Sequence, residues 1–255
     1  MTTRPDSRAI QVVLLDIEGT TTPIAFVHEV LFPFARTHLR EFLRAHAGAP
    51  EVADAVRLLA VEHDHDLAGG GQPPAWSGSA ASPALEPLAT YVEWLMDRDR
   101  KSPGLKLLQG RIWEDGYQAG TLRGQVYPDV TPAIRRWRAA GRRVAIYSSG
   151  SELAQRRLFE STEHGDLTPL LAGFFDTAVG AKVSAASYTR IAERLGVAPG
   201  AIHFVSDVTT ELTAAREAGA AVVLSLRPGN SPQPDAEGYR SIRSFDEIEF
   251  TTQLA

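Results

Sequence analysis

The sequence contains no cysteine, so it offers no disulfide, no thiolate nucleophile and no zinc site built on sulfur. No apolar run approaches the roughly 18 residues that a membrane-spanning helix requires, and the first residues show no apolar segment of the signal type. Positive charge is in deficit, because 26 basic and 31 acidic residues give a net charge of -5. A nucleic-acid footprint depends on clustered basic residues. We therefore expect a cytoplasmic monomer with no nucleic-acid or membrane partner.

The residues that are present have an ordinary globular composition, with 44% hydrophobic and 22% charged residues in a chain of 255. Short apolar runs at 10–15, 144–147, 174–179, 202–205 and 221–226 are typical of buried strands. Helical patterns lie near them at 131–140, 152–160, 184–195 and 209–218. Alternating strands and helices favour right-handed βαβ crossovers. The sequence therefore predicts an α/β fold with a Rossmann-like parallel sheet.

The stretch 21–120 breaks this alternation, because it has helical periodicity and no convincing strand. We expect an α/β core formed by residues 1–20 and 121–255, with residues 21–120 inserted as a helical module. Residues 68–83 are rich in glycine, proline and serine and are typical of a flexible linker. The acidic and histidine cluster at 63–66 has the wrong spacing for metal ligands on one helix face, so we interpret it as a solvated charged segment.

Two carboxylates, Asp16 and Glu18, follow the first predicted strand and precede a glycine–threonine turn. At the carboxyl end of a strand, the first carboxylate can bind Mg²⁺ through one oxygen and attack phosphorus with the other. The second carboxylate can then transfer protons. The alternative is that Asp16 only caps a turn and that Glu18 is solvated.

Polar side chains also follow three of the other predicted strands. Ser148 and Ser149 are placed to bind an anion at a helix start, and Lys182 to neutralise a carboxylate and a phosphate together. Asp207 is a candidate metal ligand, and Glu211 lies one helical turn further on. Taken singly, these residues are also explained by helix capping, by surface exposure and by the helix dipole. Because parallel strands end at one edge of a sheet, we expect all of them in one crevice.

The order acid pair, hydroxyl, lysine and acid resembles the haloacid dehalogenase superfamily of phosphohydrolases. More narrowly, residues 16–27, 107–113, 147–151 and 204–209 resemble the enolase-phosphatases of methionine salvage. Most members of the superfamily carry Asp at the second acid position. The Glu18 of this chain departs from that pattern and agrees with the enolase-phosphatase group.

The resemblance implies a haloacid dehalogenase-type core with a helical cap inserted after the first motif. It also implies one Mg²⁺ per chain and a substrate, 2,3-diketo-5-methylthiopentyl-1-phosphate, which is enolised and then hydrolysed to acireductone through an aspartyl-phosphate. The implied catalytic residues are Asp16, Glu18 and Lys182. The implied substrate-binding residues are Ser148, Ser149 and Lys182. The implied metal ligands are Asp16, the backbone carbonyl of Glu18, and Asp207.

Two other functions remain open on the sequence. One is a phosphatase of the same superfamily that acts on another small phosphate ester, since it would share every catalytic residue. The other is a signalling or binding module in which Asp16 accepts a phosphate without turnover. Glu18 and the large helical module argue against this second function, because a phosphate acceptor needs neither a proton donor nor a specificity domain.

Overall fold

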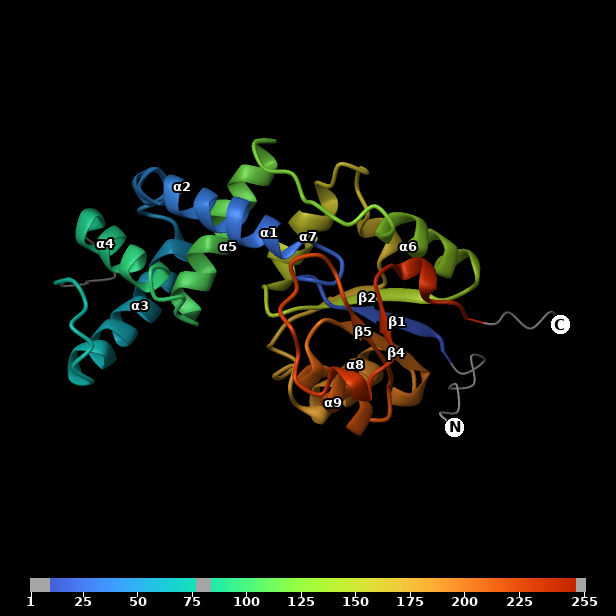
Figure 1. Ribbon diagram of the computed structural model, residues 1–255. Helices are drawn as coiled ribbons and strands as arrows, with labels where there is room; N and C mark the ends of the chain where they lie inside the picture. The colour runs from blue at the N-terminus through green and yellow to red at the C-terminus, as the bar shows by residue number, and fades with distance from the viewer. Residues whose placement is uncertain (1–9, 77–83, 251–255) are drawn as a thin grey trace. The chain divides into compact units, whose positions relative to one another are not determined.

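A computed structural model describes residues 10–76 and 84–250, and the chain divides into two compact units. The sheet unit comprises the chain up to Val27 and from Arg123 onward, and the helical unit comprises His28–Leu122 (Figure 1). Residues 21–27, which the sequence analysis assigned to the helical module, group with the sheet unit. Within the described ranges, no helix is both long and apolar enough to cross a membrane.

The sheet unit is built on six strands in the order β3-β2-β1-β4-β5-β6, and every neighbouring pair is parallel. The strands are β1 (Val12–Leu15), β2 (Arg143–Tyr147), β3 (Gly173–Phe175), β4 (Ile202–Ser206), β5 (Ala221–Ser225) and β6 (Ser241–Ile242). β1 lies in the interior of the sheet, and all four of its residues are buried. The predicted α/β fold with a parallel sheet is confirmed.

Two details of the sheet differ from the prediction. The run at 174–179 ends as a strand at Phe175. The Asp176 carboxylate there accepts a hydrogen bond from the Ala178 amide at 2.8 Å and starts a turn. The two-residue strand β6 was missed, since so short an element has no periodicity to detect.

Helices cover both faces of the sheet, with α8 and α9 on one side and α6 on the other (Figure 1). The predicted helices lie within one residue of the observed ends. These helices are α6 (Val130–Ala139), α7 (Glu152–Glu160), α8 (Ala185–Leu195) and α9 (Thr209–Glu217), with a short α1 (Ile24–Phe26) before them. Tyr188 and Ile191 of α8 and Leu212 of α9 pack against apolar side chains of the strands. This packing fixes the helices on which Lys182 and Asp207 depend.

The helical unit has its own hydrophobic core. It contains a π-helical turn η1 (Val27–Leu31) at the boundary, then α2 (Phe32–Ala45), α3 (Pro50–Ala68), α4 (Leu85–Met96) and α5 (Pro103–Gln118). Buried side chains from α2 to α5 form one cluster. Gly104 lets α5 approach α3, because a Cβ there would lie 2.6 Å from the Leu59 Cγ.

The charged segment at 63–66 is partly buried, so the prediction that it is solvated is wrong for two residues. His63 is 3% exposed and its Nε2 lies 2.8 Å from the Pro74 carbonyl oxygen. Asp66 accepts a hydrogen bond from the Tyr91 hydroxyl at 2.9 Å and pairs with Arg100 at 2.9 Å. The helical period places these two residues on the inner face of α3, while the residues between them are exposed.

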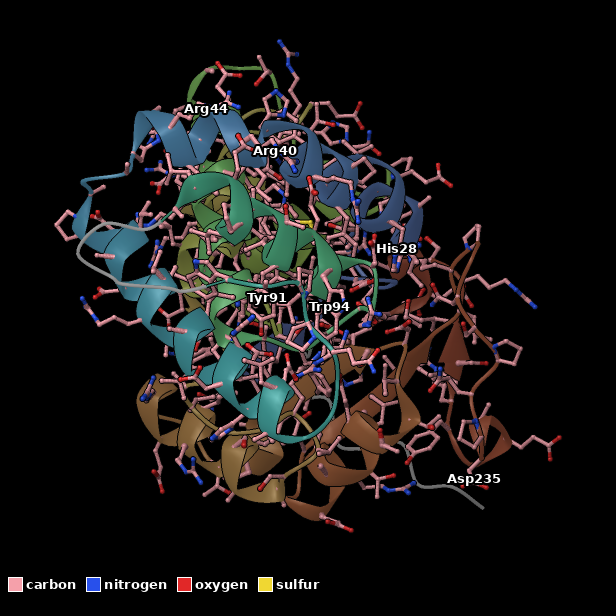
Figure 2. The ribbon with its side chains drawn as sticks, turned by 90° about the vertical axis from the view of Figure 1, so that its left-hand side faces the viewer. His28, Arg40, Arg44, Tyr91, Trp94 and Asp235 are labelled. Carbon is pink, nitrogen blue, oxygen red and sulfur yellow. The ribbon has the colours of Figure 1, made fainter. Side chains whose placement is uncertain are left out.

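Trp76 of the predicted linker stacks on Tyr91, which stacks on Trp94. Figure 2 shows Tyr91 and Trp94 side by side on α4. Only the first part of the predicted linker is described, because residues 77–83 lie outside the described ranges.

Candidate active site

The loop after β1 fixes the carboxylate of Asp16. The Asp16 amide donates to the Val205 carbonyl at 3.0 Å and extends the pairing with β4. Amides of the next turn converge on the Ile17 carbonyl, and the Thr21 hydroxyl lies 3.1 Å from the Asp16 carbonyl oxygen. Asp16 is only 4% exposed, so its charge requires compensation within the protein.

Lys182 supplies that compensation. Its Nζ lies 2.7 Å from Asp16 Oδ1 and 2.7 Å from Glu211 Oε2. Burial alone would lower the pKa of Lys182, but the two carboxylates outweigh it and raise the pKa to about 12. The Tyr188 hydroxyl donates to the Lys182 carbonyl at 2.7 Å and fixes its backbone. Lys182 is therefore a permanently charged ammonium at the end of the sheet.

Asp207 and Glu211 add negative charge beyond what Lys182 neutralises. Burial, together with the charges of Asp16 and Glu211, raises the pKa of Asp207 to about 7. Burial and the Asp16 charge likewise raise the pKa of Glu211 to about 7. The Ser206 hydroxyl joins this group, at 2.8 Å from Glu211 Oε2 and 3.3 Å from Asp16 Oδ2. Three carboxylates thus share one ammonium, which is an environment that attracts a cation.

Glu18 is half-buried on the same turn as Asp16, and a backbone bridge joins it to Thr22. The next residue, Gly19, has a positive φ of 67°. A Cβ on Gly19 would lie 2.4 Å from Asp207 Oδ2. The turn therefore requires glycine both for its conformation and for the close approach of Asp207.

Ser148 and Ser149 lie at the carboxyl end of β2, the neighbour of β1. Ser148 is buried and Ser149 is exposed, and the Ser148 amide donates to the Phe175 carbonyl at 3.1 Å. Gln155 Nε2 holds this loop through the Gly150 carbonyl at 2.8 Å. Among the described side chains, the two serines make no hydrogen bond to Asp16, Lys182 or Asp207. The structure thus joins Asp16 and Lys182 directly and places the serines at the adjacent strand end.

The charges of this site fit Mg²⁺. Within the described part of the chain, no three His, Asp or Glu side chains are grouped as a metal cage. Mg²⁺ does not need one, because it is bound by one or two carboxylates together with water and substrate phosphate. Asp16 lies on the turn that Asp207 approaches, and the excess negative charge around Lys182 suits a divalent cation.

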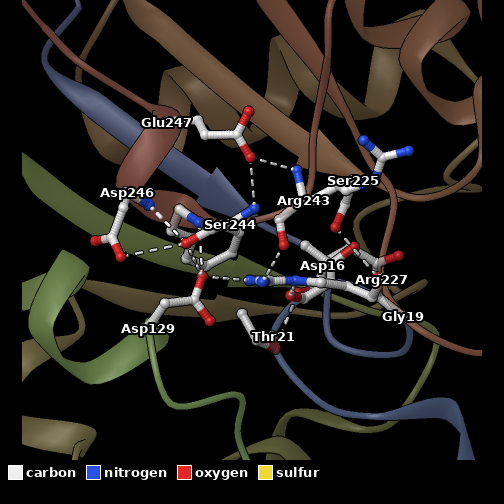
Figure 3. A network of polar contacts seen from close by, with 12 residues as sticks. Asp16, Gly19, Thr21, Asp129, Ser225, Arg227, Arg243, Ser244, Asp246 and Glu247 are labelled. Atoms are coloured by element: carbon white, nitrogen blue, oxygen red, sulfur yellow. Dashed lines mark hydrogen bonds and ion pairs between the residues drawn. The ribbon is translucent and has the colours of Figure 1, made fainter.

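Sequence reasoning missed the residues that support the loop from behind, chiefly Arg227, Asn230 and Asp129. Figure 3 shows Arg227 between Asp129 and the loop after β1, residues 16–22. Arg227 and Asn230 donate to backbone carbonyls far away in the chain, and Asp129 accepts hydrogen bonds from Arg227 and the Phe245 amide. Such contacts leave no periodic pattern in a sequence. The local signal in the sequence is weak, a charged residue, Arg227, directly after the apolar run of β5 and Leu226.

The parallel sheet with charged groups at its strand ends defines a class of hydrolase. Residues 10–219 match the sequence model of the haloacid dehalogenase-like hydrolases. The crystal structure of the UTR4 protein of Saccharomyces cerevisiae is similar, with a TM-score of 0.73 and 32% identity. That similarity covers 94% of this chain and 100% of the yeast chain.

Two relatives with high sequence identity carry the same activity in their names. The enolase-phosphatase E1 of Synechococcus elongatus is 49% identical over 240 residues, which cover 94% of this chain and 98% of that protein. A rice protein named a probable bifunctional methylthioribulose-1-phosphate dehydratase/enolase-phosphatase E1 is 44% identical, over 96% of this chain and 48% of its own. The chain belongs to the haloacid dehalogenase-like hydrolases and, within them, to the enolase-phosphatase E1 family, which confirms the resemblance.

Proposed function

We propose that this protein is a Mg²⁺-dependent enolase-phosphatase that converts 2,3-diketo-5-methylthiopentyl-1-phosphate to acireductone and phosphate in methionine salvage. The observation that carries the proposal is the buried Lys182 ammonium between Asp16 and Glu211. This arrangement places the proposed nucleophilic carboxylate directly beside a permanent positive charge. The name of the Synechococcus relative supports the choice of reaction.

Asp16 Oδ2 is the proposed nucleophile. Asp16 Oδ1 is engaged by Lys182 at 2.7 Å and by the Ile17 amide at 2.8 Å. Oδ2 receives only the Ser206 hydroxyl, at 3.3 Å, and is therefore the less committed oxygen. Its attack forms an oxygen–phosphorus bond while the ester bond of the substrate breaks. Glu18 protonates the departing enediol oxygen and then removes a proton from the water that hydrolyses the aspartyl-phosphate.

Charge neutralisation supplies most of the catalytic effect in phosphoryl transfer. Lys182 neutralises the phosphoryl oxygens, and Ser148 and Ser149 bind them from the neighbouring strand. Asp16, Asp207 and the Glu18 carbonyl would hold Mg²⁺, which supplies a second positive charge to the phosphate. With this cation, the three buried carboxylates of the site are compensated.

Enolisation moves a proton from the carbon next to a carbonyl group to the oxygen of that carbonyl group, and we assign both halves of this transfer to Glu18 as well. Its side chain is one methylene longer than the Asp that most of the superfamily carries. The assignment predicts that Glu18→Asp slows enolisation, measured as the rise of the enol chromophore. Unchanged enolisation and unchanged phosphate release in Glu18→Asp would exclude this role.

The proposed reaction is tested by recording ultraviolet absorbance and phosphate release together, with Mg²⁺ and the diketo phosphate. The native protein is expected to form an enol chromophore and then release phosphate, and Asp16→Asn to lose the release. Phosphate from other esters alone would indicate a different phosphatase. The absence of release from any ester would instead favour a phosphate-accepting module.

Mg²⁺ binding is tested without turnover. Mg²⁺ is expected to raise the thermal midpoint of the native protein, because ligand binding to the folded state adds to its stability. In Asp207→Asn the increase should shrink, since a proposed ligand is lost. Asp246→Asn is a suitable control, because this side chain is 65% exposed. Equal increases in Asp207→Asn and the native protein would exclude Asp207 as a ligand.

A further inference from the structure

The last residue of β5 and the segment that follows it bind backbone carbonyls of residues 16–22, the catalytic loop after β1 (Figure 3). The Gly19 carbonyl accepts hydrogen bonds from Ser225 Oγ at 3.2 Å and from Asn230 Nδ2 at 2.9 Å. The Thr20 carbonyl accepts one from Arg227 Nε at 3.2 Å. Two consecutive peptide groups of the loop are thus bound by three side chains from one segment.

Arg227 is itself fixed on every side. Its side chain is 4% exposed, and each of its three nitrogens has a partner. The two terminal nitrogens donate to the Asp129 carboxylate and to the Arg243 carbonyl, each at 2.8 Å. Its guanidinium carbon lies 4.4 Å from the ring centre of Tyr127 and 4.7 Å from that of Phe245. Only a planar guanidinium can make these three bonds and both ring contacts at once.

Asp129 anchors Arg227 from behind. Its Oδ2 also accepts hydrogen bonds from the Phe245 amide at 2.6 Å and the Ser244 hydroxyl at 3.2 Å. Burial would raise the pKa of Asp129, but Arg227 and the Phe245 amide outweigh it and lower the pKa. The carboxylate therefore stays charged, and the Arg227–Asp129 pair links the catalytic loop to the chain around Ser244.

We propose that Arg227 is a positioning residue for catalysis that acts through the Gly19–Thr20 peptide, an inference that rests on the proposed function. Glu18 lies between two residues that are held in place. Asp16 is held by its ion pair with Lys182, and Gly19 by the hydrogen bond from Asn230 to its carbonyl. Loosening Gly19 displaces the Glu18 carboxyl that transfers protons. Arg227 makes no contact with the groups assigned to phosphate binding, Ser148, Ser149 and Lys182, so a change at Arg227 affects turnover and leaves substrate binding intact.

The decisive variant is Arg227→Lys, which keeps a positive charge beside Asp129 but cannot donate in three directions. We expect kcat to fall about 10- to 100-fold, while KM stays within about twofold. The matched control is Arg136→Met. Arg136 donates to the Phe245 carbonyl at 3.0 Å and pairs with Asp246 but does not touch the loop. Its kcat and KM are expected to stay within about twofold of native values.

Hydrogen exchange supplies a readout that does not depend on activity. Amides of residues 17–22 are expected to exchange faster in Arg227→Lys than in the native protein and to be unchanged in Arg136→Met. If Arg227→Lys does not fold, Asn230→Ala removes a single donor to the same loop and is expected to show the same fall in kcat. Unchanged exchange, a rise in KM in place of the fall in kcat, or an equal loss in Arg136→Met would overturn the proposal.

The same variants are assayed on the diketo phosphate and on p-nitrophenyl phosphate. The two substrates distinguish an error in the proposed substrate from an error in the proposed role of Arg227. If the native protein cleaves only the second ester, the proposed substrate is wrong, but the ratio of kcat values on that ester still tests Arg227. If it cleaves neither, the exchange of residues 17–22 decides the role of Arg227.

Discussion

Lys182 is the residue on which the charges of the site depend, because its ammonium lies between Asp16 and Glu211. A buried ion pair that loses one partner leaves an uncompensated charge, and this is far more costly than the loss of an exposed pair. We therefore expect Lys182 to contribute to stability in addition to its proposed role in catalysis.

Replacing Lys182 by Met should lower the free energy of unfolding by about 3 kcal/mol at pH 8, where three carboxylates face one another. At pH 5 the loss should be smaller. The pKa values of Asp207 and Glu211 are about 7 even beside Lys182, so both groups take up protons in this range. Urea unfolding at both pH values measures the effect, with the 87% exposed Lys101 as a control site. An equal loss at pH 5 and pH 8 would contradict the argument.

His203 also makes the stability of the folded protein depend on pH. It is buried on β4, neither ring nitrogen has a hydrogen-bond partner among the described residues, and burial lowers its pKa from 6.5 to about 4. Between these values the unfolded chain binds more protons than the folded one, so stability is lost as the pH falls from 6.5 to 4. At pH 5 the loss from this residue is about 2 kcal/mol.

His203→Leu should remove this dependence. Its free energy of unfolding, relative to the native protein, should rise by about 2 kcal/mol between pH 8 and pH 5. Chemical denaturation at several pH values measures the difference, and His65→Leu, at an exposed position on α3, should show no such rise. If the free energies of unfolding of His203→Leu and the native protein differ by the same amount at both pH values, His203 is not the source of the acid dependence.

At the scale of an element, Gly19 in the turn after β1 has a left-handed backbone and lies close to the Asp207 side chain. Gly141 has the left-handed backbone alone, so comparing the two glycines separates the effect of backbone strain from that of the close contact. Gly19 and Gly141 have φ values of 67° and 78°. A Cβ on Gly19 would lie 2.4 Å from Asp207 Oδ2, whereas nothing lies within 4 Å of one on Gly141.

Gly141→Ala should therefore cost only the backbone strain, about 1 kcal/mol, and keep full activity. Gly19→Ala should pay the same strain and also displace Asp207, so that phosphate release falls at least about 10-fold. Thermal unfolding and phosphate release measure the two effects. Equal activity in the two variants would mean that the loop absorbs the methyl group without moving Asp207.

The elements differ in how far the sequence predicts them. Buried parallel strands are recognisable as apolar runs, and the acid directly after the first run marked Asp16, which the structure joins to Lys182. Lys182 was found from the predicted run at 174–179, although β3 ends at Phe175 and Lys182 does not follow it directly. Alternation of charge at 63–66 was misleading, because the helical period turns His63 and Asp66 inward. Arg227 was missed because two of its three hydrogen-bond partners are backbone carbonyl oxygens, which do not depend on the identity of the residues that carry them. Side-chain contacts to distant backbone therefore need the fold before they can be recognised.

At the scale of the whole molecule, the two units differ in how the chain builds them. The helical unit is one continuous stretch with a buried core of its own, whereas the sheet unit is assembled from two separate stretches. A continuous stretch with its own core meets the requirements of an independently folding domain.

Residues 28–122 alone are therefore expected to give a helical circular dichroism spectrum and a cooperative thermal transition. The fragment should release no phosphate, since Asp16, Lys182 and Asp207 all lie in the sheet unit. A fragment without cooperative unfolding would show that the helical core needs the rest of the chain.

The interior position of β1 affects how the protein folds during its synthesis on the ribosome. Val12 pairs with Arg143 on one side and with Ile202 on the other, so the first strand to leave the ribosome must wait for both neighbours. At ordinary elongation rates this delay is on the order of 10 s. During it the helical unit has time to fold, while the apolar strand that carries Asp16 stays exposed to chaperones and to aggregation. Synthesis from the N-terminus thus leaves the strand before Asp16 without its β4 partner until residues 202–206 have been made.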